Sequence, residues 1–255
     1  MTRRRVAGKP GAPDSAKARA DALIARMGAL GSAANLAGMA RYGIATASAF
    51  GVATPQLQAM AREIGHDHEL AAALWSTGVR EARILAAYIA DPAKLTSRRM
   101  EKWVRNVDSW DVCDNCCLHL FRRSPLAWEC ALRWSSDDAE LVKRAGFALV
   151  ATLAVHDKVA ADAKFLAMLP VIEIGAEDDR NFVNKAVNWA LRQIGKRNLR
   201  LQKAAVRTSK RLMKSASKSA RWIGSDALRE LESPAVRTRL ADKTARGQTR
   251  KLRGG

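Results

Sequence analysis

The feature that most constrains this chain is its succession of Ala- and Leu-rich segments, cut by helix-start and helix-stop signals and lacking any alternating β-branched run. Thr54-Pro55 predicts a helix start, which we expect to end near Gly65. Asp67 predicts the next start, Gly78 a break, and Thr96 a further cap. The sequence therefore predicts an all-α protein of paired helices with short connections.

Weak internal similarity indicates that these helix pairs repeat. Val142-Lys143-Arg144-Ala145 and Val183-Asn184-Lys185-Ala186 align at an offset of about 41 residues, within the range of HEAT-type repeats. The same offset pairs Ala148 with Trp189. We expect a HEAT-like helical-repeat solenoid, whose stacked helices form an extended binding surface.

Charge divides the chain into three parts. The whole carries +19, of which residues 1–20 contribute +5 and residues 192–255 contribute +15, so residues 21–191 are nearly neutral. We predict a basic disordered arm over 1–13, a helical-repeat domain over 14–233 and a basic C-terminal tail over 234–255. Pro234 is expected to end regular structure.

Composition excludes several classes of protein. No run of 18 apolar residues could form a conventional transmembrane helix, and the basic N-terminus lacks the apolar core of a secretory signal. Four Cys, three of them within 113–117, do not make a secreted disulfide framework. We expect a cytoplasmic protein, nucleoid-associated if bacterial, with a polyanionic partner, no membrane and no cofactor.

Residues 196–221 predict a helix with one strongly basic face, and no acid stands between Asp179 and Asp226. A polyphosphate partner would relieve this uncompensated charge, whereas the Ala-rich opposite side does not favour deep membrane insertion. The basic positions recur every three or four residues: Lys196, Arg200, Lys203, Arg207, Lys210, Lys214, Lys218 and Arg221.

The segment 108–119 is the richest in functional side-chain types. Trp110 and Asp114 are four residues apart, so an aromatic plane and a carboxylate share one helix face; packing of Trp110 in the core is the alternative. Cys113-x2-Cys116, with Cys117 and Cys130, has ligand types suited to zinc, but no second pair at finger spacing. Small buried thiols between helices are the interpretation we adopt.

Four stretches together make the chain similar to the AlkD-type DNA alkylation repair glycosylases, which are all-helical proteins of HEAT-like repeats. They occur in the family's order over about residues 40–195: Gly51-Val52-Ala53-Thr54-Pro55, Trp110-Asp111-x-x-Asp114, Lys143-Arg144-Ala145 and Lys185-Ala186-Val187-Asn188-Trp189-Ala190-Leu191-Arg192. Gln58 stands where the family commonly has Arg, and the cysteine group and long basic C-terminus are additional.

The resemblance implies a monofunctional DNA glycosylase that excises N3-alkyladenine and N7-alkylguanine from duplex DNA in base excision repair. It implies a concave cleft that holds the lesion without a base-flipping pocket. By position, Asp114, Trp110 and Trp189 become the catalytic residues and Arg144 the cleft arginine. Together with the basic helix, we predict these DNA-binding residues: Arg144, Lys143, Lys185, Arg192, Lys196, Arg197, Arg200, Lys203 and Arg207.

Two other functions fit the same sequence. One is a non-catalytic protein of this fold that binds particular DNA structures, and the other is a protein-binding helical scaffold. We expect the partner to be double-stranded DNA containing alkylated bases, with no metal, no obligate protein partner and a monomeric protein.

Overall fold

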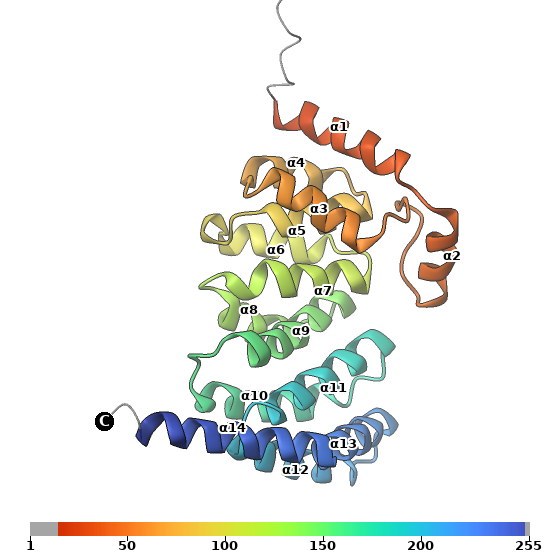
Figure 1. The fold of residues 1–255 in the computed structure, drawn as a ribbon. Helices are drawn as coiled ribbons and strands as arrows, with labels where there is room; N and C mark the ends of the chain where they lie inside the picture. The colour runs from red at the N-terminus through yellow and green to blue at the C-terminus, as the bar shows by residue number, and fades with distance from the viewer. Residues whose placement is uncertain (1–14, 253–255) are drawn as a thin grey trace, which may run out of the picture. The chain divides into compact units, whose positions relative to one another are not determined.

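A computed structural model describes residues 15–252, and this part of the chain is helical, without strands (Figure 1). The predicted all-α class is therefore confirmed. The chain divides into two compact units, Met1–Lys94 and Leu95–Gly255. Among the described residues, no helix is both long and apolar enough to cross a bilayer. The predicted arm, 1–13, lies outside the described residues.

The first unit follows the predicted start and stop signals closely. Asp67 accepts a hydrogen bond from the Leu70 N–H at 3.0 Å, and Gly65 ends the preceding helix at φ 73°, where a side chain would be strained. Ser15 caps the first helix. The elements are α1 (Ala16–Ala29), α2 (Ala33–Arg41), α3 (Thr54–Ile64), α4 (His68–Ser76), α5 (Arg80–Ile89) and the 3-10 helix η1 (Pro92–Lys94).

Glu81, fully buried on α5, fixes the chain that leads into α3. Its carboxylate accepts hydrogen bonds from the backbone N–H groups of Phe50, Gly51 and Val52 at 3.0, 2.9 and 3.3 Å. A buried carboxylate requires such partners, because an uncompensated charge is costly to remove from water. The Gly51-Val52 stretch is thus held by its backbone, and the sequence alone did not point to Glu81.

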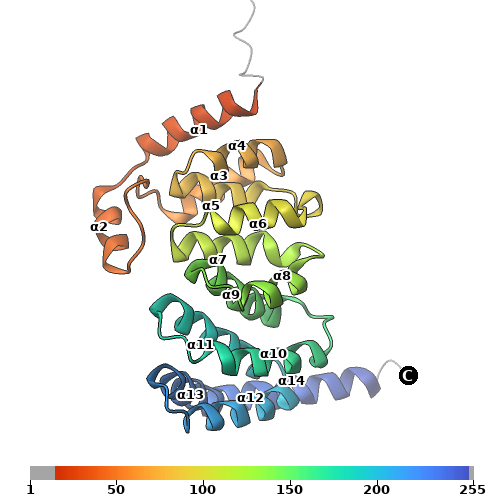
Figure 2. The ribbon, with the colours of Figure 1, turned by 180° about the vertical axis from the view of Figure 1, so that it is seen from behind.

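The second unit forms two rows of helices. The site row consists of α7 (Trp110–His119), α9 (Glu140–His156), α11 (Asn181–Gly195) and α13 (Lys218–Leu231). The opposite row consists of α6 (Ser97–Arg105), α8 (Ala127–Trp134), α10 (Asp162–Gly175) and α12 (Leu199–Leu212). The 3-10 helix η2 (Phe121–Arg123) follows α7, and α14 (Pro234–Leu252) contacts α12 and α13. Helices α10 and α11 lie side by side in both views (Figures 1 and 2). The starts of α9 and α11 are 41 residues apart, as the internal similarity predicts.

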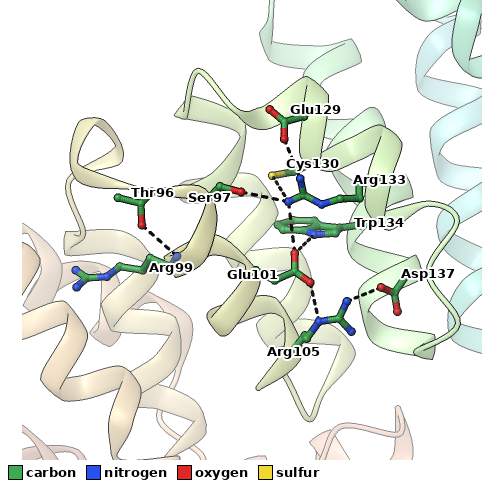
Figure 3. Close-up of polar contacts among 10 residues, drawn as sticks. All are labelled: Thr96, Ser97, Arg99, Glu101, Arg105, Glu129, Cys130, Arg133, Trp134 and Asp137. Atoms are coloured by element: carbon green, nitrogen blue, oxygen red, sulfur yellow. Dashed lines mark hydrogen bonds and ion pairs between the residues drawn. The ribbon is translucent and has the colours of Figure 1, made fainter.

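Polar contacts join α6 to α8 within the opposite row (Figure 3). The Glu101 carboxylate accepts from the Trp134 indole N–H at 2.8 Å and pairs with Arg133 at 3.4 Å and Arg105 at 2.6 Å. Arg105 also pairs with Asp137 at 2.7 Å. Trp134 is fully buried, so its N–H needs this acceptor, and the two helices are held in one register.

Gly146 shows how closely α8 and α9 pack. A Cβ at this position would lie 2.3 Å from the Ser135 backbone nitrogen and 2.7 Å from its Cα. The close approach is therefore between helices, and it brings most of α9 into the core.

The prediction that Pro234 ends regular structure is wrong. Pro234 opens α14, and Ser233 caps it by accepting from the Val236 N–H at 3.4 Å. Proline has no N–H to lose at the first helical position, so Ser233-Pro234 is a helix start. The basic segment after residue 233 is helical through Leu252.

Candidate functional site

The site begins at the N-terminus of α7, where Ser109 occupies the N-cap position. Trp110 and Asp114 lie one helical turn apart, as the spacing predicts, and both are half-buried. Asp111 is buried between them along the chain, and its carboxylate accepts from the Ser109 hydroxyl at 2.6 Å. This local network orients the first turn of α7.

Arg144 on α9 binds the Asp114 carboxylate through two parallel hydrogen bonds. Its Nε lies 3.0 Å from Oδ1 and its Nη2 lies 2.7 Å from Oδ2. This bidentate geometry is the strongest form of ion pair in proteins and fixes the orientation of the carboxylate. The Arg144 side chain is only 7% exposed and that of Asp114 is 22% exposed, so the Asp114 side chain is the more accessible of the two.

The same guanidinium also contacts two further elements. Its Nη1 donates to the Phe182 carbonyl of α11 at 2.7 Å, and its Cζ lies 5.3 Å from the centre of the Trp110 ring. Cation–π attraction at that distance is worth about 0.5–2 kcal/mol. Trp110, Asp114 and Arg144 are thus brought together, as predicted. The Arg144 guanidinium is buried and bonded within the protein, where it orients Asp114. A contact of Arg144 with a DNA phosphate stays a prediction.

Burial and charge act in opposite directions on this pair. Burial raises the pKa of Asp114 above its ordinary value, against the lowering effect of Arg144, and the nearby Asp111 raises it further. Burial lowers the pKa of Arg144, but the charge and hydrogen bonds of Asp114 more than offset this and leave it raised. The bidentate geometry and the raised pKa of Arg144 indicate an ionised pair at neutral pH.

Lys143, the neighbour of Arg144, faces a different carboxylate. Its Nζ lies 3.0 Å from Asp178, which also pairs with Arg180 at 2.6 Å. The hydrogen bonds of Arg180 hold the pKa of Asp178 far below its ordinary value, against the opposing effect of burial, and those of Lys143 lower it further. This cluster ties α9 to the start of α11 beside the Arg144–Phe182 contact.

Trp189 lies on α11 seven residues beyond Phe182, about 10 Å further along the helix axis. The indole is half-buried. In the amide orientation that satisfies both neighbours, the Gln193 side-chain oxygen accepts from Trp189 Nε1 and from Lys196 Nζ, each at 3.2 Å. Trp189 therefore presents its ring edge to a polar stripe of α11.

Two of the predicted DNA-binding residues at the C-terminal end of α11 are ion-paired. Arg192 lies 2.5 Å and Lys196 lies 2.6 Å from the Glu230 carboxylate of α13, and Arg192 also lies 3.9 Å from Asp226. Lys185 is exposed, and no carboxylate within the described part of the chain pairs with it. Lys185 is thus the basic residue of α11 most available to a ligand.

Arg197 is anchored within the protein, and its contact with DNA stays a prediction. It is 9% exposed, and its guanidinium donates to the carbonyls of Ala154 and Ala160 at 3.1 and 3.0 Å. Its Cζ also lies 4.4 Å from the centre of the Phe165 ring. Arg197 therefore caps the C-terminal end of α9 by hydrogen bonding to the Ala154 carbonyl, where the helix dipole favours a cation.

The single helix with one basic face predicted for residues 196–221 is wrong, because α12 ends at Leu212, residues 213–217 are not helical, and α13 begins at Lys218. The basic residues are therefore divided between the two rows. Arg200, Lys203 and Arg207 are exposed along α12, while Trp110, Asp114, Arg144 and Trp189 are on α7, α9 and α11. The structure therefore does not bring these three cations into the cluster around Asp114. Their contact with DNA remains a prediction, and it involves a different row of helices.

The cysteines pack between helices. All four are buried with free thiols, and the Cys113 and Cys117 sulfurs lie 3.5 Å from the α9 carbonyls of Leu141 and Ala145. Burial raises the pKa of Cys117 well above its ordinary value and that of Cys130 to about 11. No group of three metal-ligand side chains is close enough to hold an ion, within the residues that the structure describes.

The fold is that of the HEAT-like repeat proteins. The sequence profile of the family named DNA alkylation repair enzyme matches residues 23–231, and the chain belongs to that family. A solved structure with TM-score 0.71 and 21% identity covers 86% of this chain and 95% of its own. It is described as a new family of proteins related to the HEAT-like repeat DNA glycosylases with affinity for branched DNA structures. No curated protein gives a significant sequence match.

Proposed function

We propose that this protein is a monofunctional DNA glycosylase that releases cationic alkylated purines, N3-alkyladenine and N7-alkylguanine, from duplex DNA. The observation that carries the proposal is the partly exposed Asp114 side chain, whose carboxylate is oriented by Arg144, with Trp110 against the same guanidinium. Membership of the DNA alkylation repair enzyme family supports DNA as the substrate.

The chemistry needs little from the protein because the lesion is already activated. When the bond between C1′ and N9 breaks, its electron pair moves onto the purine and neutralises the positive charge. The sugar is left as an oxocarbenium ion, which a carboxylate stabilises electrostatically. Water then adds to C1′ and loses a proton, which gives the abasic site and the free base.

Asp114 is suited to this task even while it is bound to Arg144. An ionised carboxylate has about four lone-pair positions, and the two hydrogen bonds from Arg144 leave about two for a water molecule or for the sugar. Trp110 and Trp189 would contact the lesion or its deoxyribose, and exposed cations such as Lys185 would hold the backbone.

The test is the release of 7-methylguanine from alkylated duplex by wild type and Asp114→Asn under single-turnover conditions. Asparagine keeps an oxygen for the Arg144 Nε but removes the charge, so we expect release to fall about 100-fold or more while duplex binding persists. Asp178→Asn is the matched control, because it also removes an ion-paired carboxylate that contacts α9. Unchanged release by Asp114→Asn would exclude the assignment of Asp114.

A second function is favoured by one observation. Both oxygens of Asp114 already accept hydrogen bonds, an arrangement that also suits a purely structural ion pair. In that case the protein recognises DNA shape without excision, and the solved relative is described as having affinity for branched DNA structures. Tight binding of four-way junctions by wild type, with no base released from alkylated duplex, would establish this function instead.

A further inference from the structure

A pocket of about 260 Å³ lies where the C-terminal ends of α9 and α11 meet α14. Its polar lining is unusual because it contains cations and one amide but no carboxylate. These residues are Lys158, Gln193, Lys196, Arg197, Arg239 and Lys243. Five positive side chains around one small space call for a counter-charge.

Backbone carbonyls anchor these cations without neutralising them. Lys243 Nζ donates to the Arg197 carbonyl at 2.7 Å, Arg239 Nη2 donates to the Lys196 carbonyl at 3.5 Å, and Lys158 donates to the Val155 carbonyl. A carbonyl at a helix C-terminus carries only a partial negative charge, so each cation keeps most of its own. The anchors fix the cations in place around the pocket.

Ion pairing compensates only one of the five. Lys196 pairs with Glu230, whereas Lys158, Arg197, Arg239 and Lys243 form no ion pair with any carboxylate of the described chain. Burial lowers the pKa of Lys243, and the charges of Lys158, Arg197 and Arg239 lower it further, against a small opposing effect of Asp162. The cluster therefore repels itself and is relieved by an anion.

We propose that this pocket binds a phosphate group, supplied by the backbone of the DNA duplex that the protein holds. A phosphodiester offers a negative charge and several acceptor oxygens, which match converging ammonium and guanidinium donors. The DNA source rests on the proposed function's duplex binding, although it does not depend on base excision. A free phosphorylated molecule would bring the same chemistry.

The position of the pocket favours the DNA backbone. Gln193 lines the pocket and also accepts from the Trp189 indole, so the pocket continues the polar stripe of α11 that begins at Trp189. Lys196 is seven residues beyond Trp189, about 10 Å along the helix, which corresponds to about three base steps of B-DNA. A duplex strand at Trp189 thus reaches the pocket a few nucleotides away.

The α14 contribution lies beyond the part of the chain that matches the family. Arg239 and Lys243 are one helical turn apart on α14, beyond residue 231, where the match to the family ends. The pocket is therefore completed by a segment that lies outside the family match, and these two residues are the natural targets for a test.

The experiment measures the dissociation constant of the full chain for an undamaged 20-base-pair duplex at several salt concentrations. Lys243→Gln keeps a donor for the Arg197 carbonyl but removes the charge. One lost phosphate contact reduces the logarithmic salt slope by about 0.9, so wild-type affinity should fall about 3-fold more than that of Lys243→Gln between 50 and 200 mM salt. Arg237→Gln, an exposed change on the same helix and outside the pocket lining, should behave as wild type.

A second measurement separates the sources of phosphate. Inorganic phosphate, compared with chloride at equal ionic strength, should raise the Tm of wild type and of Arg237→Gln but not of the double variant Arg239→Gln/Lys243→Gln. Equal Tm shifts in all three proteins would overturn the pocket. If phosphate raises the Tm of wild type and Arg237→Gln but not of the double variant, while Lys243→Gln has the same salt slope as wild type, the pocket binds phosphate that does not come from DNA. A free phosphorylated molecule would then be the ligand. Failure of wild type to bind duplex would contradict the proposed function, while the Tm measurement would still test the pocket.

Discussion

Asp114 and Arg144 face each other across α7 and α9 with two hydrogen bonds of 3.0 and 2.7 Å, and both side chains are largely buried. Neither charge can be removed alone without leaving the other in a poorly solvated position. The pair therefore contributes to folding as well as to the proposed chemistry, and experiments must separate the two.

The ion pair predicts strong coupling in a double-mutant cycle. Arg144→Gln leaves Asp114 buried without its cation and should lower the free energy of unfolding by about 3 kcal/mol. The double variant Asp114→Asn/Arg144→Gln should recover at least about 1 kcal/mol of the summed single losses. Urea unfolding at pH 7 measures all four proteins, and additive losses would show that the two residues do not act as a pair.

The raised pKa of Asp114 predicts the acid limb of the activity profile. Only the carboxylate form stabilises the sugar cation, so release should decline as pH falls through the folded-state pKa, at a pH above the ordinary aspartate value of about 3.9. Single-turnover release between pH 4 and pH 8, corrected for spontaneous loss of the base, checks this. A profile that is flat down to pH 4 would contradict the environment described for Asp114.

The lowered pKa of Asp178, in contrast to the raised pKa of Asp114, predicts that stability falls at low pH. Its folded-state pKa lies below the unfolded value because of Arg180 and Lys143, so its contribution is complete above the unfolded pKa and disappears as pH falls through the folded pKa. Asp178→Asn should cost about 2 kcal/mol at pH 7 and progressively less below about pH 4. Thermal unfolding across this range measures the difference, and a constant loss at every pH would rule out the ion-pair origin.

The contact at Gly146 predicts that even one methyl group disrupts the packing of α8 against α9. Gly146→Ala should cost about 1–3 kcal/mol or more, because its Cβ would meet the Ser135 backbone and not a movable side chain. Gly38→Ala in α2 is the control: no atom lies within 4 Å of the new Cβ, so stability should rise by about 0.5–1 kcal/mol. Chemical unfolding measures both changes, and an unchanged stability of Gly146→Ala would contradict the prediction.

The exposed cations of α12 predict an effect on binding that is separate from the chemistry. Neutralising Lys203 and Arg207 together should weaken duplex affinity and lessen its salt dependence, since each phosphate contact contributes about 0.9 to the slope. The release rate at saturating protein should stay at the wild-type value, because α12 is in the opposite row from Asp114. A reduced rate constant would place α12 in the chemical step.

Much of the fold was predictable because its signals are local. Gly65, Asp67, Gly78 and Thr96 bound helices in the structure as the sequence predicts. A cap or a stop depends on a few neighbouring residues, so it can be identified without knowledge of the tertiary structure. Pro234 was misinterpreted because proline both ends and starts helices, and only the Ser233 cap distinguishes the two.

The site was predictable only in part, because its geometry is not local. The spacing of Trp110 and Asp114 places them on one face, but their meeting with Arg144 depends on how α7 packs on α9, across 30 residues. Arg197 and Arg207 are both basic residues in the sequence, yet the first is buried against carbonyls and the second is exposed. Burial decides which cation is available, and it is set by tertiary packing.

One guanidinium links three consecutive helices of the site row, because Arg144 on α9 donates hydrogen bonds to Asp114 of α7 and to the Phe182 carbonyl of α11. Sliding of α11 along α9 must therefore either break the bond to Phe182 or carry Arg144, and with it the carboxylate, to a new position. The orientation of Asp114 therefore depends on the position of α11 relative to α9. A ligand that moved α11 relative to α9 would change the orientation of the carboxylate.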